Sequence, residues 1–366
     1  MNLLTAQAPG GVPRSGKGLA LGIWRFMLVA LALVLSLGLT QVAVAQADPD
    51  REMTTAAPGI TAEQWRQVRS GETGPNYRDS RFDSNYSLIN SSGETWREIR
   101  NRWVSPFGLI AVFGMAALIA LFYFIVGRKE LEAPRTGRLL LRWTLMKRAL
   151  HWTVATLFII LALTGMTLLF GKFVFRPLFG DGIWAWMIAA TKVLHNYLGP
   201  IFGILLVILL VSLIKENIPK KHDWVWFKKG GGMIGKKHVD AGFANGGEKA
   251  WYWLLATVGL LVIASGFVLD FPNFNQGRDT MQWANIIHAV GALGLTAVSF
   301  GHIYIGTLGT EGALEGMTTG YVDETWAKEH HNLWYEEVKD QTLSEEEVAA
   351  RKSSGSSGEP SAPRPS

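Results

Sequence analysis

Four histidines in apolar parts of the chain have the residue type and the spacing of haem ligands. His288 and His302 stand fourteen residues apart in one apolar run, and His151 and His195 each stand near the start of another. At ~1.5 Å and ~100° per residue, fourteen positions separate two side chains by about 21 Å along a helix and by roughly 40° around it. One helix could therefore supply ligands at both surfaces of a membrane.

The competing interpretation of any single histidine is a hydrogen-bonded interior residue. Ionisable residues inside a bilayer are rare and usually mark a functional site, which weakens that interpretation. Neutral imidazole is a good ligand for haem iron, and two histidine ligands leave no open position for oxygen or substrate. Two pairs at matching levels therefore predict a membrane cytochrome b in which two b haems carry electrons.

Composition supports a membrane protein. The 366 residues are 48% hydrophobic, and the apolar residues are gathered into long uninterrupted runs. Cysteine is absent, which excludes disulfides, c-type haem attachment and an iron–sulfur cluster held within this chain. The formal net charge of +5 comes from basic residues beside the apolar runs, so we expect membrane lipid and not nucleic acid as a partner.

The chain divides into five predicted parts. The first apolar run is preceded by basic residues and followed by Ala45-Gln46-Ala47, as in a secretory signal peptide; an uncleaved signal anchor is the alternative. The parts are a signal peptide (1–47), an exported polar segment (48–103), an extra transmembrane helix (104–127), a di-haem domain (139–338) and a disordered tail (339–366).

Five apolar runs are close to the ~20 residues that a bilayer requires; they are residues 106–126, 151–170, 194–214, 251–271 and 283–305. The predicted fold is thus an all-α integral membrane protein, with a four-helix di-haem cytochrome b bundle, an extra N-terminal transmembrane helix and a signal peptide. Small residues in these runs favour either close helix packing or clearance for a haem; they are Gly165, Gly199, Gly203, Gly291 and Gly294. Aromatic residues at the helix ends are typical of an interfacial belt; they are Trp152, Trp251, Trp253, Trp283 and Tyr304.

The basic loops predict the orientation. Lysine and arginine concentrate in residues 128–148 and 215–249, whereas the other connections contain few. Because cytoplasmic loops carry the excess of positive charge, both basic loops should be cytoplasmic. Alternation then pairs His195 with His288 near the outer face and His151 with His302 near the inner face.

Several motifs resemble the gamma subunit of respiratory formate dehydrogenases, over residues 139–338. They are Lys147-Arg-Ala-Leu-His151-Trp152, Asn245-Gly-Gly-Glu-Lys249, the pair His288 and His302, and a tail that contains Tyr321-Val-Asp-Glu-Thr-Trp-Ala-Lys-Glu-His-His331. The histidines are shared with cytochromes b of membrane hydrogenases and other oxidoreductases, so the tail is the more specific motif. The long N-terminal extension departs from the family pattern.

The resemblance implies a path for electrons in a bacterial inner membrane. A molybdenum or tungsten catalytic alpha subunit oxidises formate, and an iron–sulfur beta subunit passes the electrons to the outer haem. The inner haem then reduces a quinone, either menaquinone or ubiquinone. The family's quinone pocket maps onto Asn245 and Gly247, and His302 could reach the quinone through its second ring nitrogen. From the residues alone, Asn245 is equally well explained as a helix N-cap before a Gly-rich turn.

Two other functions remain open. One is a similar cytochrome b that serves a hydrogenase or another reductase. The other is a haem-free anchor or transporter whose histidines relay protons, which the shortage of intramembrane carboxylates other than Asp270 disfavours. Of the other histidines, His222 and His238 are expected to be solvated or to contact anionic lipid. We expect no metal site at His330 and His331, because no suitable ligand spacing surrounds them.

Overall fold

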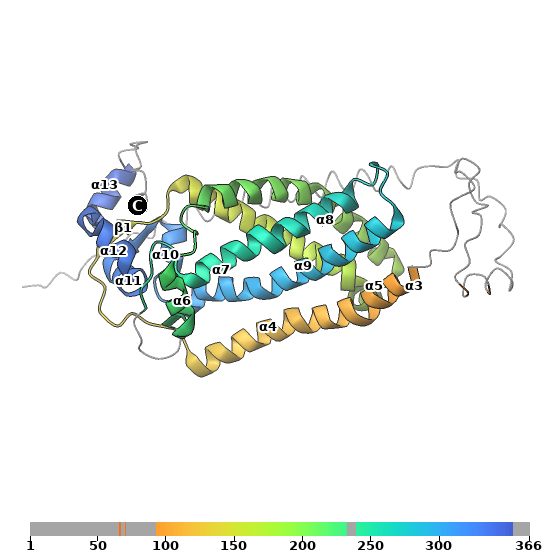
Figure 1. The fold of residues 1–366 in the computed structure, drawn as a ribbon, viewed down its shortest axis with the longest axis horizontal. Coiled ribbons are helices and arrows are strands. Elements are labelled where there is room, and N and C mark those ends of the chain that lie inside the picture. Colours follow the sequence, from red (N-terminus) through yellow and green to blue (C-terminus); the bar gives the residue numbers. More distant parts are fainter. Residues whose placement is uncertain (1–65, 67–69, 71–92, 233–238, 354–366) are drawn as a thin grey trace, which may run out of the picture.

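The computed structural model describes residues 66, 70, 93–232 and 239–353 (Figure 1). The predicted signal peptide and residues 48–65 and 71–92 of the predicted exported segment lie outside the described residues. Within the described part, four helices are long and apolar enough to cross a membrane, and one of them has 69 residues. The predicted membrane fold is confirmed, and the chain is mostly helical.

The first membrane helix is longer than predicted. α3 (Gly93–Glu98), η1 (Ile99–Val104) and α4 (Ser105–Val126) follow one another without a break, so the end of the expected polar segment is helical. α4 lies along α9 (Arg278–Tyr304), where Gly108 faces Leu293. Val104 and Val112 are buried against the same leucine. The extra helix is therefore packed onto the bundle through small and branched apolar residues.

The second helix makes two passes. α5 (Leu145–Leu213) begins after Thr144, whose side chain accepts a hydrogen bond from the Lys147 backbone N–H, and it reverses direction at Gly180. Gly180 has φ 77° and ψ 172°, a conformation that only glycine adopts readily. Val154 consequently packs with Leu206 and Leu210 from the other half. The two halves contain the predicted spans 151–170 and 194–214.

Two further passes complete the four-helix bundle. After the short α6 (Lys221–Lys228) and η2 (Gly230–Gly232), one pass runs through α7 (Gly246–Leu254), η3 (Leu255–Gly259) and α8 (Leu260–Asp270). The other runs through α9 and η4 (Ile305–Gly309). A β-carbon at Gly291 would lie 2.6 Å from Val262, and one at Gly203 would lie 3.0 Å from Ile263. These two glycines therefore serve close helix packing.

A small domain, which we call the cap (residues 128–144 and 310–353), closes the basic end of the bundle. Its sheet was not predicted: β1 (Arg138–Leu141) lies between β2 (Tyr321–Asp323) and β3 (Leu343–Ser344), antiparallel to both. Its short helices are α10 (Ala313–Thr318), α11 (Glu324–His330), α12 (Asn332–Val338), η5 (Lys339–Gln341) and α13 (Glu345–Ser353). Its core contains Leu140, Val322, Trp326, Ala327, Trp334 and Val338. Phe243, from the segment before α7, packs into the same core.

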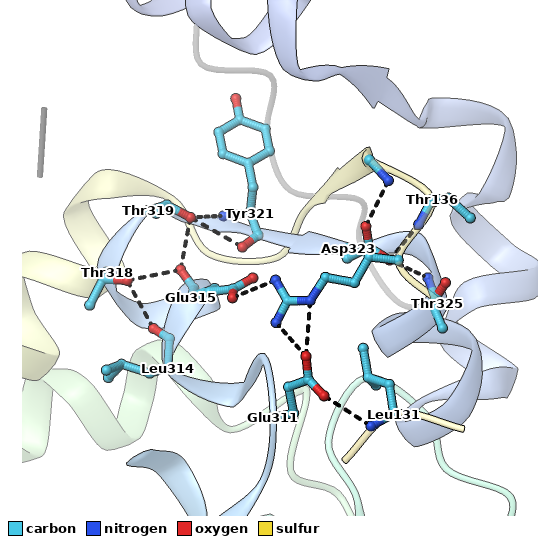
Figure 2. Close-up of polar contacts among 12 residues, drawn as sticks. Leu131, Thr136, Glu311, Leu314, Glu315, Thr318, Thr319, Tyr321, Asp323 and Thr325 are labelled. Carbon is cyan, nitrogen blue, oxygen red and sulfur yellow. Dashed lines mark hydrogen bonds and ion pairs between the residues drawn. The ribbon is translucent and has the colours of Figure 1, made fainter. Parts of the chain in front are cut away.

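Polar contacts tie the loop after α4 to the C-terminal part of the chain (Figure 2). Asp323 accepts hydrogen bonds from the backbone N–H groups of Thr136, at 3.4 Å, and Thr325, at 2.8 Å. Glu311 accepts one from the Leu131 backbone at 3.1 Å. The cap is therefore assembled from segments about 180 residues apart.

The prediction of disorder from residue 339 onward is wrong for residues 339–353. β3 pairs with β1 through Leu139 and Leu343, and Val348 of α13 is buried beside Leu141 and Tyr321. A few apolar residues in a Glu-rich and Ser-rich segment are enough to dock it, because β1 offers an open edge. Residues 354–366 lie outside the described part of the chain.

Candidate functional site

Two pairs of histidines face each other between the helices, as the spacing predicted. His151 of α5 and His302 of α9 form the cap pair, named for its position near the cap, with ring centres 6.2 Å apart. His195, in the second half of α5, and His288 of α9 form the far pair, with ring centres 6.1 Å apart. The planes of the paired rings are inclined by 60° in the cap pair and by 82° in the far pair.

The spacing of each pair fits one metal ion between two imidazoles. An imidazole nitrogen binds a transition metal at about 2.0 Å, and the ring centre lies roughly 1.2 Å behind that nitrogen, so two opposed ligands place their ring centres about 6.4 Å apart. Both observed separations lie close to this value. A direct hydrogen bond between the rings would require a closer approach of their nitrogens. The arrangement therefore fits bis-histidine ligation of a haem at each level.

Hydrogen bonds orient both rings of the far pair. His288 Nδ1 lies 2.9 Å from the Val262 carbonyl oxygen, which can only accept, so Nδ1 carries the proton. His195 Nδ1 lies 2.8 Å from Thr164 Oγ1. This Thr164 hydroxyl already donates to the Ile160 carbonyl at 2.8 Å, so it accepts from His195. Both Nε2 atoms are left with the lone pair that a metal needs.

The cap pair has different surroundings. The Trp251 ring stacks on His302, with ring centres 5.0 Å apart and planes inclined by 14°. His151 Nδ1 is buried, and within the described residues it has no hydrogen-bond partner. We predicted Trp251 to lie in an interfacial belt, but it contacts a candidate ligand. The sequence does not indicate this contact, because it depends on how α7 is positioned against α9.

Glycines make room for the far pair. A β-carbon at Gly165 would lie 3.3 Å from His195 Cε1, and one at Gly266 would lie 3.0 Å from His288 Cε1. Gly199 and Gly294 have no atom within 4 Å of an added β-carbon. Of the predicted small residues, Gly165 thus lies directly at a candidate ligand, and clearance for a haem stays a prediction.

Asn245 and Gly247 lie where α7 begins, at the basic end of the bundle. The Asn245 side-chain oxygen accepts from the Glu248 backbone at 3.0 Å, and the Glu248 carboxylate accepts from the Asn245 backbone at 2.8 Å. Asn245 is therefore an N-cap, as one of its two interpretations predicted. A β-carbon at Gly247 would lie 2.7 Å from the Trp226 ring of α6. The lack of a side chain at Gly247 thus makes room for the Trp226 indole. Because the Asn245 side-chain oxygen caps the helix, its amide nitrogen is the atom that could donate to a ligand.

A buried cationic cluster lies between this N-cap and the cap. Arg142 is 3% exposed and donates to the Phe243 carbonyl at 2.9 Å and to Glu248 at 3.2 Å. The Trp326 ring lies 4.9 Å from the Arg142 guanidinium, a cation–π contact. Burial lowers the pKa of Arg142. Sequence reasoning missed this cluster because its members come from three distant segments.

His331 is the other buried titratable group in the cluster. It is 1% exposed, and Nδ1 donates to the Gly242 carbonyl at 2.7 Å. Burial lowers the pKa of His331 well below its ordinary 6.5, and the Arg142 charge lowers it further. Among the described residues, no group of three or more His, Cys, Asp or Glu side chains could hold a metal ion. His222 lies 3.6 Å from Asp223, and His238 lies outside the described residues.

Comparisons with known proteins match the bundle. Residues 142–320 match the family described as prokaryotic cytochrome b561. The nitrate-inducible formate dehydrogenase cytochrome b556(Fdn) subunit of Escherichia coli K12 is 27% identical over 209 residues, 56% of this chain and 93% of the relative. The formate dehydrogenase cytochrome b556(fdo) subunit of the same strain is 28% identical over 210 residues, 56% and 95% of the two chains. The Haemophilus influenzae formate dehydrogenase cytochrome b556 subunit is 27% identical over 202 residues, 52% and 79%.

Proposed function

Because residues 142–320 match the prokaryotic cytochrome b561 family and the chain is a multi-pass protein of the bacterial inner membrane, we propose that it is the cytochrome b subunit of a formate dehydrogenase complex. In this role it carries electrons from a periplasmic iron–sulfur beta subunit, through two b haems, to quinone at the cytoplasmic side. A molybdenum or tungsten alpha subunit would oxidise the formate. The relatives are formate dehydrogenase subunits, and they match the chain over most of their own length.

The observation that carries the proposal is the presence of two histidine pairs with ligand spacing, one near each end of the bundle. His195 and His288 would hold one haem, and His151 and His302 the other. Each haem, when bound by its two histidines, would supply a one-electron carrier. The protein's contribution is to fix the rings and to keep water and oxygen from the irons.

The direction of electron transfer follows from the basic loops. The loops before α5 and between α5 and α7 are rich in lysine and arginine, so the cap side is placed in the cytoplasm. Electrons would then enter at the far pair and leave at the cap pair. A quinone reduced there would take its protons from the cytoplasm, so turnover would charge the membrane. Moving each charge against 100 mV costs about 2.3 kcal/mol.

We propose that the quinone binds beside the N-terminus of α7. The Asn245 amide nitrogen can donate to a quinone oxygen, while its oxygen keeps the helix cap. The Trp226 ring of α6 lies against Gly247 and offers an apolar surface beside Asn245. His302 belongs to the histidine pair near the cap, and its second ring nitrogen could bond to the quinone.

Adding formate to the purified complex tests the electron donor. Formate is expected to reduce the b haems of the chain, and a quinone analogue should then reoxidise them. Both changes are followed by the haem absorbance. Reduction by hydrogen but not by formate would instead assign the chain to a hydrogenase. No reduction by either donor, in a preparation that dithionite does reduce, would overturn both assignments.

A further inference from the structure

The two histidine pairs differ in what contacts the Nδ1 atoms and the ring faces. In the far pair, both Nδ1 atoms have an acceptor, the Val262 carbonyl and the Thr164 hydroxyl. In the cap pair, His151 Nδ1 has no hydrogen-bond partner within the described residues, and His302 is stacked on Trp251. Both sites thus have two histidines, but the groups that contact those histidines differ.

Thr164 is held as an acceptor by its own helix. Its hydroxyl hydrogen is directed to the carbonyl oxygens of Ile160 and Leu161, at 2.8 and 3.1 Å. The lone pairs of Oγ1 therefore face His195 Nδ1, and Thr164 is buried, with 8% of its surface exposed. This geometry permits one tautomer of His195, with the proton on Nδ1 and the lone pair on Nε2.

A hydrogen bond donated from Nδ1–H raises the electron density on the ligating nitrogen. A more electron-rich ligand favours the ferric over the ferrous state, and this lowers the reduction potential of the iron. Resting on the proposed function, we infer that Thr164 is a positioning residue that lowers the potential of the far-pair haem below that of the cap-pair haem. The electron lost by the far-pair iron is the electron gained by the cap-pair iron, and no proton moves in this step.

Substitutions at Thr164 separate this effect from packing. Thr164→Val keeps the branched shape and removes the acceptor, whereas Thr164→Ser keeps the hydroxyl. Thr167→Val is the matched control, because Thr167 lies one turn later and its hydroxyl donates only to the Leu163 carbonyl. The measurement is a spectroelectrochemical titration of the b haems in the purified full chain. The component that is missing in His195→Ala identifies the far-pair haem.

Thr164→Val is expected to raise the midpoint of the far-pair component by about 59 mV, which is a tenfold change in the ratio of reduced to oxidised iron. Thr164→Ser and Thr167→Val should leave it near the wild-type value. An unchanged midpoint in Thr164→Val, or an equal shift of both components, overturns the inference. If Thr164→Val loses a haem, Thr164→Cys, whose thiol is a weaker acceptor, must show the upward shift. Absence of haem from the wild-type chain would instead overturn the proposed function.

Discussion

At the scale of single residues, the sequence predicted how the four histidines pair but not the groups that orient their rings. The four histidines could be paired because helix geometry and loop charge fix their levels. Thr164 and Val262 lie 31 and 26 residues away from the histidines that they contact. Which threonine or carbonyl faces a given ring depends on the rotation of one helix against another, and the sequence pattern does not record that rotation.

His331 should make the protein less stable in acid. The unfolded chain protonates this histidine near pH 6.5, whereas burial lowers its pKa in the folded protein. Below about pH 6.5 the unfolded state therefore binds more protons, and stability should fall by up to about 1.4 kcal/mol per pH unit until the lowered pKa is reached. Stability above pH 7 should not depend on this group.

The variant His331→Asn tests this prediction, because an amide can still donate to the Gly242 carbonyl and does not titrate. Thermal unfolding in detergent is measured between about pH 5 and 8, the range in which histidine changes charge. The wild-type midpoint should fall more steeply in acid than that of the variant. Parallel curves would show that His331 is not protonated on unfolding.

At the scale of elements, the sequence predicted the membrane passes well and the cap poorly. Runs of about 20 apolar residues identify a membrane helix without knowledge of its neighbours. The strands of the cap have two to four residues and pair with segments far away in the chain. Strands of that length leave no periodicity to detect, so the sheet and the ordered tail could not be predicted.

The reversal of α5 at Gly180 provides a test at this scale. An added β-carbon meets no atom within 4 Å there, so any cost comes from the backbone alone. Alanine at φ 77° and ψ 172° should destabilise the fold by about 1–3 kcal/mol. Gly182→Ala is the matched control: its added β-carbon also meets no atom, and alanine in a helix should stabilise by up to about 1 kcal/mol. Thermal midpoints that shift equally in the two variants would contradict this explanation of the turn.

At the scale of the whole molecule, the bundle holds two ligand pairs and the other parts adapt it. α4 packs on α9 beside Leu293. α9 is the helix that carries one histidine of each pair. The cap closes the end of the bundle near the cap pair. It also buries Arg142 against the start of α7. The N-terminal helix and the cap thus both brace the elements that position the ligands, while the outer surface of the bundle stays apolar for lipid.

The central claim is that this one chain holds two haems, each between two named histidines. The most direct measurement is a reduced-minus-oxidised spectrum with a haem count on the purified chain, together with His195→Ala and His302→Ala. We expect two b haems per chain and the loss of a different haem in each variant. No haem, or the loss of the same haem in both variants, would contradict it.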